Sequence, residues 1–246
     1  MNKINLKWAW EYVTSLWYTP YYIGVYWSQN YNLHTEKSDV DYKCIILPTL
    51  EELVKNSKPI SKSIDFESWL IDLKDIRFYV ENAAKVNINF IEILSTSYFL
   101  WDEEIRKFFI PLIKNLPLQF IRCCNGMMNM KYVALSHPYP SKEYEIKTFG
   151  YDPKQLLHIV RLHWVICRYL EWNYSFLEIE ENREKLLYIK SWKLSLKEAE
   201  AMASEYIEKT KKIINDLSLE ENYEIKKEII KFSQDVIYNN IKKQLT

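Results

Sequence analysis

The sequence predicts an α+β protein in which a small mixed-sheet core is followed by a mainly helical C-terminal region. Short runs rich in β-branched and aromatic residues lie before residue 75, and long hydrophobic periods typical of helices fill the chain from about residue 98. A chain of 246 residues is long enough for one large or two small domains. We therefore expect an α/β domain over 1–97 and a helical domain over 98–246.

The individual elements follow from composition and from helix-capping signals. Strand-like runs occupy 21–27, 40–47 and 63–73, the last as a third strand or one arm of a hairpin. Thr49 followed by Glu52 is a capping-box signature, and Asp75 can cap a helix that runs to about Val86. The later helices are expected at 102–115, 119–135, 153–172 and 181–190, with an amphipathic pair within 196–245.

Composition excludes several classes of partner. Lys+Arg and Asp+Glu both total 33, so the formal net charge is zero, and we expect no strong nonspecific binding to nucleic acid. The four cysteines form no C-x-x-C pair, which favours a reducing, cytoplasmic compartment. No apolar run approaches the roughly 18 residues that a membrane helix needs. Charged residues interrupt the start of the chain, so we expect neither export nor a membrane partner.

Three aspartates form the candidate metal site. Asp39 and Asp41 are two residues apart at the start of an expected strand, so both carboxylates point to one face. Hard cations such as Mg²⁺ or Mn²⁺ bind one or two carboxylates together with substrate phosphates. Asp72, between Ile71 and Leu73, is the preferred third carboxylate, and Asp65 is the reserve. Taken alone, a D-x-D pattern is more often an ordinary polar turn.

Asp39 and Asp41 lie within the first of several sequence blocks that occur in a recognisable order. The pattern Ser28-x-Asn30-Tyr31-x-Leu33-x-Thr35-x-x-Ser38-Asp39-x-Asp41 resembles the signature of the DNA polymerase β-like nucleotidyltransferase superfamily. It is most similar to predicted nucleotidyltransferases of bacteria and phages. The resemblance continues through blocks at 71–77, 85–94 and 150–162, and it covers roughly residues 22–200.

The resemblance implies a specific chemistry. A nucleoside monophosphate would pass from a nucleoside triphosphate (NTP), such as ATP, to a hydroxyl on RNA, a protein or a small molecule. Asp39 and Asp41 would hold the metals, Asp72 would complete the site and help to deprotonate the hydroxyl, and Ser28 would contact the terminal phosphates. Asn30 belongs to the same nucleotide-binding loop. The helical region would pack on the active-site cleft.

A basic stripe is the second candidate feature. Lys154, His158 and Arg161 recur at i, i+4 and i+7 of an expected helix, where they can bind a triphosphate. By spacing alone, such a stripe is more often a solvated basic face, but it lies inside one of the family-like blocks. Asn87, Asn89 and Glu92 are equally suited to lining a ligand site or to capping a helix. Asp152 and Pro153 mark the start of the helix.

The pattern breaks at Trp27, where the family has glycine directly before the serine. Trp172 and Trp192 also stand where family-like sequences carry glycine, and Asn32 replaces another. The chain has 3 Gly, where average usage of about 7% would give roughly 17, but it has 9 Trp. We hypothesise that UGA codons meaning glycine have been written as tryptophan.

If Trp27 is genuine, its indole crowds the loop. The alternative function is then a catalytically impaired nucleotide-binding or partner-binding module of the same fold. A nucleic-acid-binding protein without chemistry is the weakest hypothesis, because the chain has no basic block.

Overall fold

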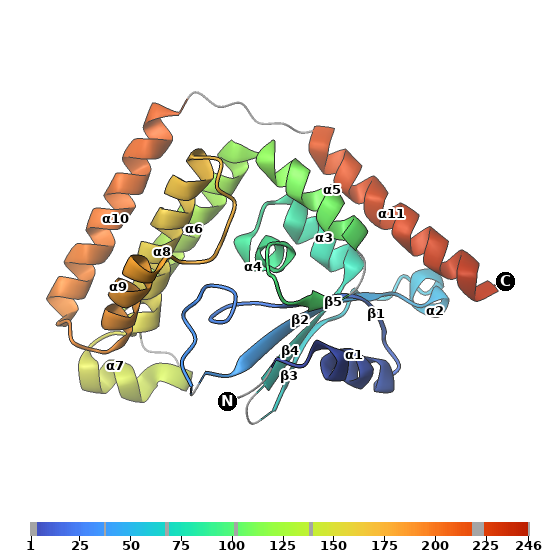
Figure 1. Ribbon diagram of the computed structural model, residues 1–246, viewed down its shortest axis with the longest axis horizontal. Coiled ribbons are helices and arrows are strands. Elements are labelled where there is room, and N and C mark those ends of the chain that lie inside the picture. Colours follow the sequence, from blue (N-terminus) through green and yellow to red (C-terminus); the bar gives the residue numbers. More distant parts are fainter. Residues whose placement is uncertain are drawn as a thin grey trace. The chain divides into compact units, whose positions relative to one another are not determined.

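The computed structural model gives the fold of most of the chain (Figure 1). The residues that it describes are 4–36, 38–66, 69–100, 103–137, 140–217 and 224–245. They form a mixed five-stranded sheet with helices, and a mainly helical region follows the sheet, so the predicted α+β class is confirmed. None of the helices within these ranges combines the length and the apolar character that crossing a membrane requires.

The chain divides into two compact units. Unit 1 comprises Met1–Leu116 together with Glu221–Thr246, and unit 2 comprises Pro117–Glu220. The division predicted from the sequence lies earlier, between residues 97 and 98. The C-terminal helix belongs to unit 1, where it packs against the helix that follows the sheet's second parallel strand. A return of the chain to its first unit is a tertiary property that local periodicity does not encode.

Unit 1 contains the sheet, several short helices and the long C-terminal helix. Its strands are β1 Thr19–Val25, β2 Val40–Leu47, β3 Ser61–Asp65, β4 Trp69–Asp75 and β5 Phe99–Leu100. Its helices are α1 Leu6–Ser15, α2 Leu50–Val54, α3 Ile76–Ala84, α4 Ile88–Ile91, the 3₁₀ turn η1 Glu92–Leu94, α5 Glu103–Lys114 and α11 Glu224–Leu245. The strand expected at 40–47 is confirmed, and the 63–73 run is the last part of one hairpin strand and most of the next. Helix α1 was not predicted.

The strand order is β3-β4-β2-β1-β5. Strands β2 and β4 are parallel, with Asp41 opposite Leu70 and Lys43 opposite Asp72, whereas the other pairs are antiparallel. Helix α2 and strand β3 form the connection between the two parallel strands. Parallel neighbours need such a crossover, because a tight turn can only reverse the chain.

One face of the sheet is the hydrophobic core of unit 1. Val40, Tyr42 and Cys44 alternate along β2 with residues of the other face, and all three are fully buried. They pack with Ile71 and Leu73 of β4 and with helix α1, which contributes Ala9 and Val13. Because side chains alternate along a strand, the intervening residues Asp41, Lys43 and Asp72 lie on the opposite face.

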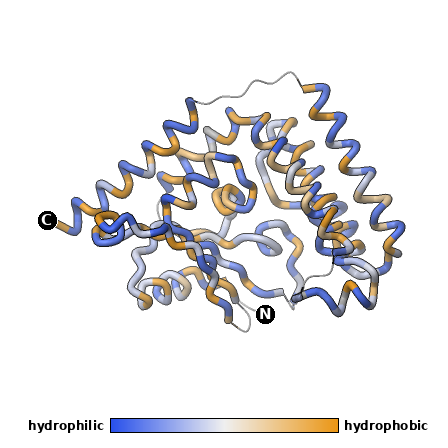
Figure 2. Tube along the Cα trace, turned by 180° about the vertical axis from the view of Figure 1, so that it is seen from behind, coloured by the Kyte–Doolittle hydropathy of each residue, from blue (hydrophilic) through white to orange (hydrophobic). Residues whose placement is uncertain are grey.

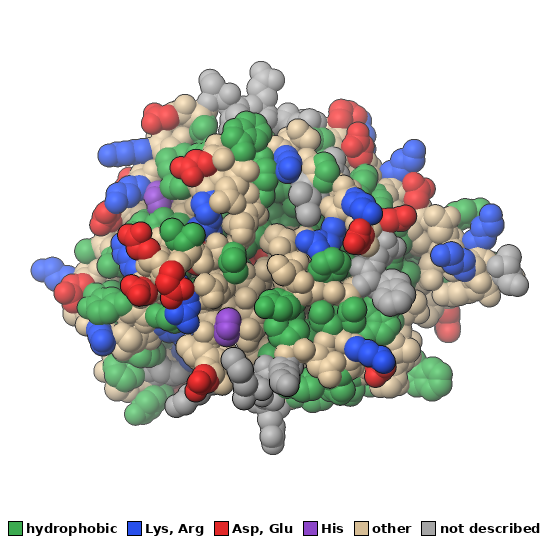
Figure 3. Space-filling view, viewed as in Figure 1, with side chains coloured by type: hydrophobic (Ala, Val, Ile, Leu, Met, Phe, Trp, Pro, Cys, Tyr) green, Lys and Arg blue, Asp and Glu red, His purple; other side chains and the backbone are tan. Residues whose placement is uncertain are grey.

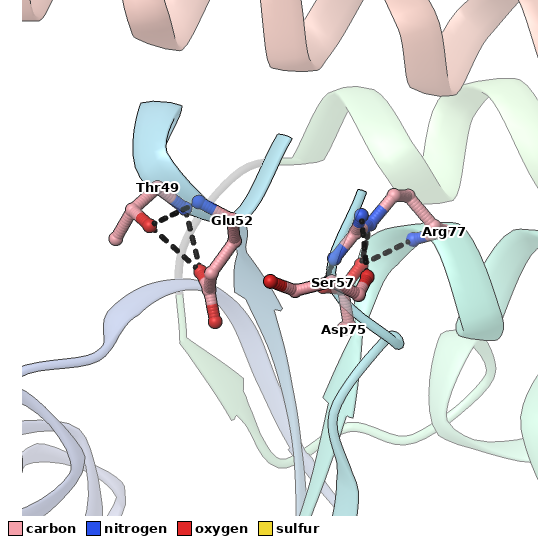
Figure 4. Close-up of polar contacts among 5 residues, drawn as sticks. All are labelled: Thr49, Glu52, Ser57, Asp75 and Arg77. Carbon is pink, nitrogen blue, oxygen red and sulfur yellow. Dashed lines mark hydrogen bonds and ion pairs between the residues drawn. The ribbon is translucent and has the colours of Figure 1, made fainter. Parts of the chain in front are cut away.

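Helix caps at the end of β2 and β4 follow the predicted signals (Figure 4). The Thr49 hydroxyl accepts a hydrogen bond from the Glu52 backbone N–H, and the Glu52 carboxylate accepts one from the Thr49 N–H, which completes the capping box. Asp75 accepts from the Arg77 backbone N–H at 2.8 Å and pairs with the Arg77 guanidinium at 2.6 Å. The Arg77 guanidinium also donates to the Ser57 carbonyl, which ties the start of α3 to the loop between α2 and β3.

Unit 2 is helical in its described residues. Its elements are α6 Pro117–Ala134, the 3₁₀ turn η2 Pro140–Lys142, α7 Glu143–Phe149, α8 Pro153–Leu170, α9 Glu180–Lys190 and α10 Leu196–Asp216. Asp152 caps α8 with Pro153 in its first turn, as predicted, and Ser195 with Glu198 forms a second capping box. The helices alternate hydrophobic and hydrophilic segments along the trace (Figure 2), which is typical of amphipathic helices that share a core.

Candidate active site in unit 1

The Asp72 carboxylate is the best-defined polar group on the second face of the sheet. It is only 8% exposed, although it points away from the core that Ile71 and Leu73 enter. Oδ1 lies 2.8 Å from the Lys74 Nζ and accepts a hydrogen bond from the Ser63 hydroxyl at 3.1 Å. Oδ2 lies 3.8 Å from the Lys43 Nζ. Two ammonium groups therefore compensate the charge of this buried carboxylate.

Lys43 is the functional candidate that sequence reasoning missed. Its side chain is 3% exposed and donates to the backbone carbonyl of Asn89. The ammonium lies 4.4 Å from the centre of the Tyr26 ring and 5.1 Å from that of Phe90. Burial lowers the pKa of Lys43 to about 8, although the Asp72 charge opposes this shift. The only signal in the sequence was a lysine two residues after Asp41, inside an apolar strand.

Asp41, the second residue of β2, is half-buried, and Asp39, directly before the strand, is exposed. The backbone carbonyl of Asp41 accepts a hydrogen bond from the Tyr26 N–H at 3.0 Å, which joins this strand to the loop after β1. Burial raises the pKa of the Tyr26 phenol, and the negative charges of Asp72 and Asp41 raise it further. Asp41 and Asp72 therefore both lie near the Tyr26 hydroxyl.

Asp65, the reserve carboxylate, lies on the same face. It is exposed on β3 and pairs with Leu70, and Leu70 pairs with Asp41 on the other side. Asp65 and Asp41 thus flank one residue in a row across three strands. Of the two candidates for the third carboxylate, Asp72 is buried and ion-paired, whereas Asp65 is open to solvent.

Asp39 and Asp41 are the carboxylates that the sequence predicts as ligands of a metal ion. Among the residues that the structure describes, no three His, Cys, Asp or Glu side chains are grouped so that they could hold a metal ion. Asp41 lies in β2, whereas Asp39 lies one residue before the strand and is exposed. Mg²⁺ is commonly held by one or two carboxylates together with water and substrate phosphates. That Asp39 and Asp41 hold such an ion stays a prediction.

The loop after β1 contains the predicted nucleotide-binding residues. Trp27 and Asn32 both have positive φ, at 57° and 60°, so the backbone turns sharply at both ends. The half-buried Ser28 accepts a hydrogen bond from the Leu33 N–H through its carbonyl. Asn30 is 6% exposed, and its side-chain amide donates to the Glu92 carbonyl at 3.0 Å. Asn30 thus anchors the loop to η1, and its contact with a nucleotide stays a prediction.

Asn87 resolves one of the open alternatives from the sequence. Its side chain accepts a hydrogen bond from the Asn89 backbone N–H at 3.1 Å and caps α4. The Asn89 carbonyl is in turn the acceptor for Lys43. The segment that begins at Asn87 therefore contacts the polar face of the sheet through Lys43, and the geometry gives Asn87 a capping role.

The basic stripe of α8 lies in unit 2. Lys154 is exposed, His158 is half-buried and Arg161 is 2% exposed, so the stripe runs from solvent into the helical core. Burial lowers the pKa of His158 well below its usual value, and the charges of Arg161 and Lys131 add to the effect. The imidazole is therefore neutral at pH 7, and Lys154 and Arg161 carry the charge of the stripe. Its binding to a triphosphate stays a prediction.

Acidic and basic side chains are interspersed on the face drawn in Figure 3, in line with the zero net charge.

Comparison with known proteins gives no relative for this chain. No family model matches it, and no curated protein sequence matches it.

Proposed function

We propose that the protein is a metal-dependent nucleotidyltransferase that moves a nucleoside monophosphate from an NTP to a hydroxyl acceptor. One observation carries the proposal: Asp41 and Asp72 lie on the same face of two adjacent parallel strands, and a sharp turn with Ser28 is hydrogen-bonded to the start of the first strand. The resemblance in sequence gives the same residues the same roles. Fold alone would not assign a reaction, so the weight rests on these side chains.

The reaction requires positioning more than covalent chemistry. The acceptor oxygen attacks the α-phosphorus of the NTP, the bond from phosphorus to the bridging oxygen breaks, and pyrophosphate leaves with the electron pair. Bound Mg²⁺ or Mn²⁺ would neutralise charge on the phosphates. Asp39 and Asp41 would hold the cation, Ser28 would donate to the terminal phosphates, and Asp72 of β4 or Asp65 of β3 would take the proton of the acceptor hydroxyl.

Lys43 has a positioning role in this proposal. Its ammonium lies between the Asp72 carboxylate and the Asn89 carbonyl, so it fixes β2, β4 and α4 relative to one another. Lys74 holds the other oxygen of Asp72. The two lysines compensate the charge of this buried carboxylate, because a lone buried charge would be costly.

The test is transfer of label from each α-labelled NTP, with Mg²⁺ or Mn²⁺ present, to the components of a cell extract. We expect label transfer by the natural chain and its loss in Asp39→Asn and Asp41→Asn. Asp235→Asn, which removes an exposed carboxylate from α11, is the matched control and should retain transfer. Label that persists in Asp41→Asn would refute the proposal.

Two further variants assign the third carboxylate. Asp72→Asn and Asp65→Asn each remove one candidate, and the one that abolishes transfer without loss of the folded state identifies it. Circular dichroism and the urea midpoint check folding, because Asp72→Asn also removes the partner of two lysines. If neither variant changes the rate, neither Asp72 of β4 nor Asp65 of β3 is the proton acceptor.

A binding module without chemistry is the second candidate. The observation that favours it is Trp27, whose side chain is 45% exposed on the loop that would contact phosphate. This candidate predicts thermal stabilisation by a nucleotide or a protein partner and no label transfer in any variant. Stabilisation by Mg²⁺-NTP together with label transfer would exclude it.

A further inference from the structure

The backbone divides the tryptophans into two groups. Eight described residues have positive φ, and four of them are tryptophan: Trp17 at 66°, Trp27 at 57°, Trp172 at 61° and Trp192 at 62°. Only a few per cent of non-glycine residues adopt this conformation, and Asn, Asp and His are the types enriched there. The other described tryptophans, Trp8, Trp10, Trp69 and Trp164, have ordinary φ.

Three of the four stand where helices characteristically end in glycine. Trp17, Trp172 and Trp192 each follow the C-cap residue of a helix, namely α1, α8 and α9. The Trp172 N–H donates to the Tyr169 carbonyl at 3.1 Å, and the next N–H, of Asn173, donates to Arg168 at 2.9 Å. This paired closure requires a left-handed residue, and glycine is the usual one because it has no Cβ to strain.

The side chains of Trp17 and Trp172 make little packing contact that could offset this backbone strain. Trp17 is 92% exposed and Trp172 is 77% exposed, although tryptophan is a highly buried residue type on average. By contrast, Trp8 and Trp69 pack edge to face, with ring centres 3.7 Å apart, against the core of unit 1. The ring centres of Trp192 and Phe149 are 4.4 Å apart, so the Trp192 side chain is packed. The case against tryptophan at position 192 therefore rests on its backbone conformation alone.

At the other described positions with positive φ, the residue type or its packing explains the left-handed backbone. Gly150, at the end of α7, has a φ of 85°. Asn32 and Asn56 belong to a residue type that tolerates this region. Val86 is strained in the same way after α3, but its side chain is fully buried in the core, and that packing holds it. Trp17 and Trp172 have neither explanation.

We propose that positions 17, 27, 172 and 192 are glycine in the natural protein, encoded by UGA codons that its translation system reads as glycine. One cause then accounts for the strained tryptophans, for the exposure of Trp17, Trp27 and Trp172, and for part of the glycine shortage. At position 27 it also removes an indole from the loop before Ser28. Only that last consequence rests on the proposed function; the assignment itself does not.

The codons of the gene test the proposal directly. We expect UGA at 17, 27, 172 and 192, and UGG at the four tryptophans with ordinary φ, which serve as matched controls within one chain. UGG at the four strained positions overturns the proposal. UGA at all eight positions also overturns it, because tryptophan would then be the general meaning of that codon.

Peptides of the protein isolated from its own cells provide the second test. Mass spectrometry should find glycine at the four positions and tryptophan at Trp8 and Trp69. In the recombinant chain, Trp17→Gly and Trp172→Gly should each raise the urea midpoint, whereas the control Trp8→Gly should lower it. Tryptophan in the peptides, or lowered midpoints for Trp17→Gly and Trp172→Gly, overturns the assignment. All of these results are independent of nucleotidyl transfer, so a failure of the proposed function would be recognised separately.

Discussion

Lys43→Met probes the charge that is buried beside the candidate site. The wild-type ammonium is 3% exposed, and its pKa is about 8 in the folded protein, against about 10.4 in an unfolded chain. Between these values the unfolded state binds more protons than the folded state, so the stability contributed by Lys43 rises with pH. Below pH 8 both states are protonated and the contribution is nearly constant.

The size of the effect follows from the shift. One pKa unit corresponds to about 1.4 kcal/mol, so the whole shift represents about 3 kcal/mol, of which about 2 kcal/mol appears between pH 7 and pH 9.5. Methionine keeps an apolar stem of similar length and cannot titrate. The difference in unfolding free energy between wild type and Lys43→Met should therefore move by about 2 kcal/mol in favour of wild type over this range.

Urea unfolding at a series of pH values measures this difference. Buried thiols such as Cys44, whose pKa is raised by burial, destabilise the fold at alkaline pH, but they contribute equally to both proteins and cancel. Lys55→Met is the control, because the Lys55 side chain is 67% exposed, and its profile should run parallel to that of wild type. A wild-type to Lys43→Met difference that stays constant from pH 7 to pH 9.5 would refute the reasoning.

Three other changes have expected outcomes. Trp172→Gly should stabilise unit 2 by about 0.5–1 kcal/mol in calorimetry, because relief of left-handed strain exceeds the added freedom of the unfolded chain. Val86→Gly, at the equivalent position after α3, should destabilise instead, since a fully buried side chain is lost. Glu178→Gln should cost about 3 kcal/mol in urea unfolding, because it leaves the Arg168 guanidinium, bound at 2.8 and 2.9 Å, without its buried counter-charge. A loss below about 1 kcal/mol would contradict that role.

Local signals in the sequence were sufficient to predict where many of the helices begin. Thr49, Asp75, Asp152 and Ser195 each use a short polar side chain to satisfy backbone N–H groups within three residues, which is information that four consecutive letters contain. The first three of these caps were predicted. Helix α1 was not, because its many aromatic residues are mediocre helix formers, and the helix is stabilised by packing on the sheet rather than by propensity.

The candidate site was only partly predictable, because some of its contacts join residues that are far apart in the sequence. Alternation along β4 correctly placed Asp72 opposite the core, since Ile71 and Leu73 are fully buried. The ion pair with Lys43 depends on the register between two parallel strands that are separated by a helix and a further strand. Nothing local specifies that register. The same limit applies to Asn30, whose partner is the distant carbonyl of Glu92.

The tryptophans connect the two kinds of information. Motif spacing marked Trp27, Trp172 and Trp192 as misplaced through a resemblance to other sequences, and the backbone marks the same three through their φ angles alone. The backbone adds Trp17, which no motif covers, because its anomaly appears only once α1 is known to end at Ser15. A criterion that uses no homologue thus recovers the residues that the motif selected and extends them by one. If the codon of Trp17 is UGA, the φ angle has predicted a genetic-code assignment at a position where the resemblance was silent.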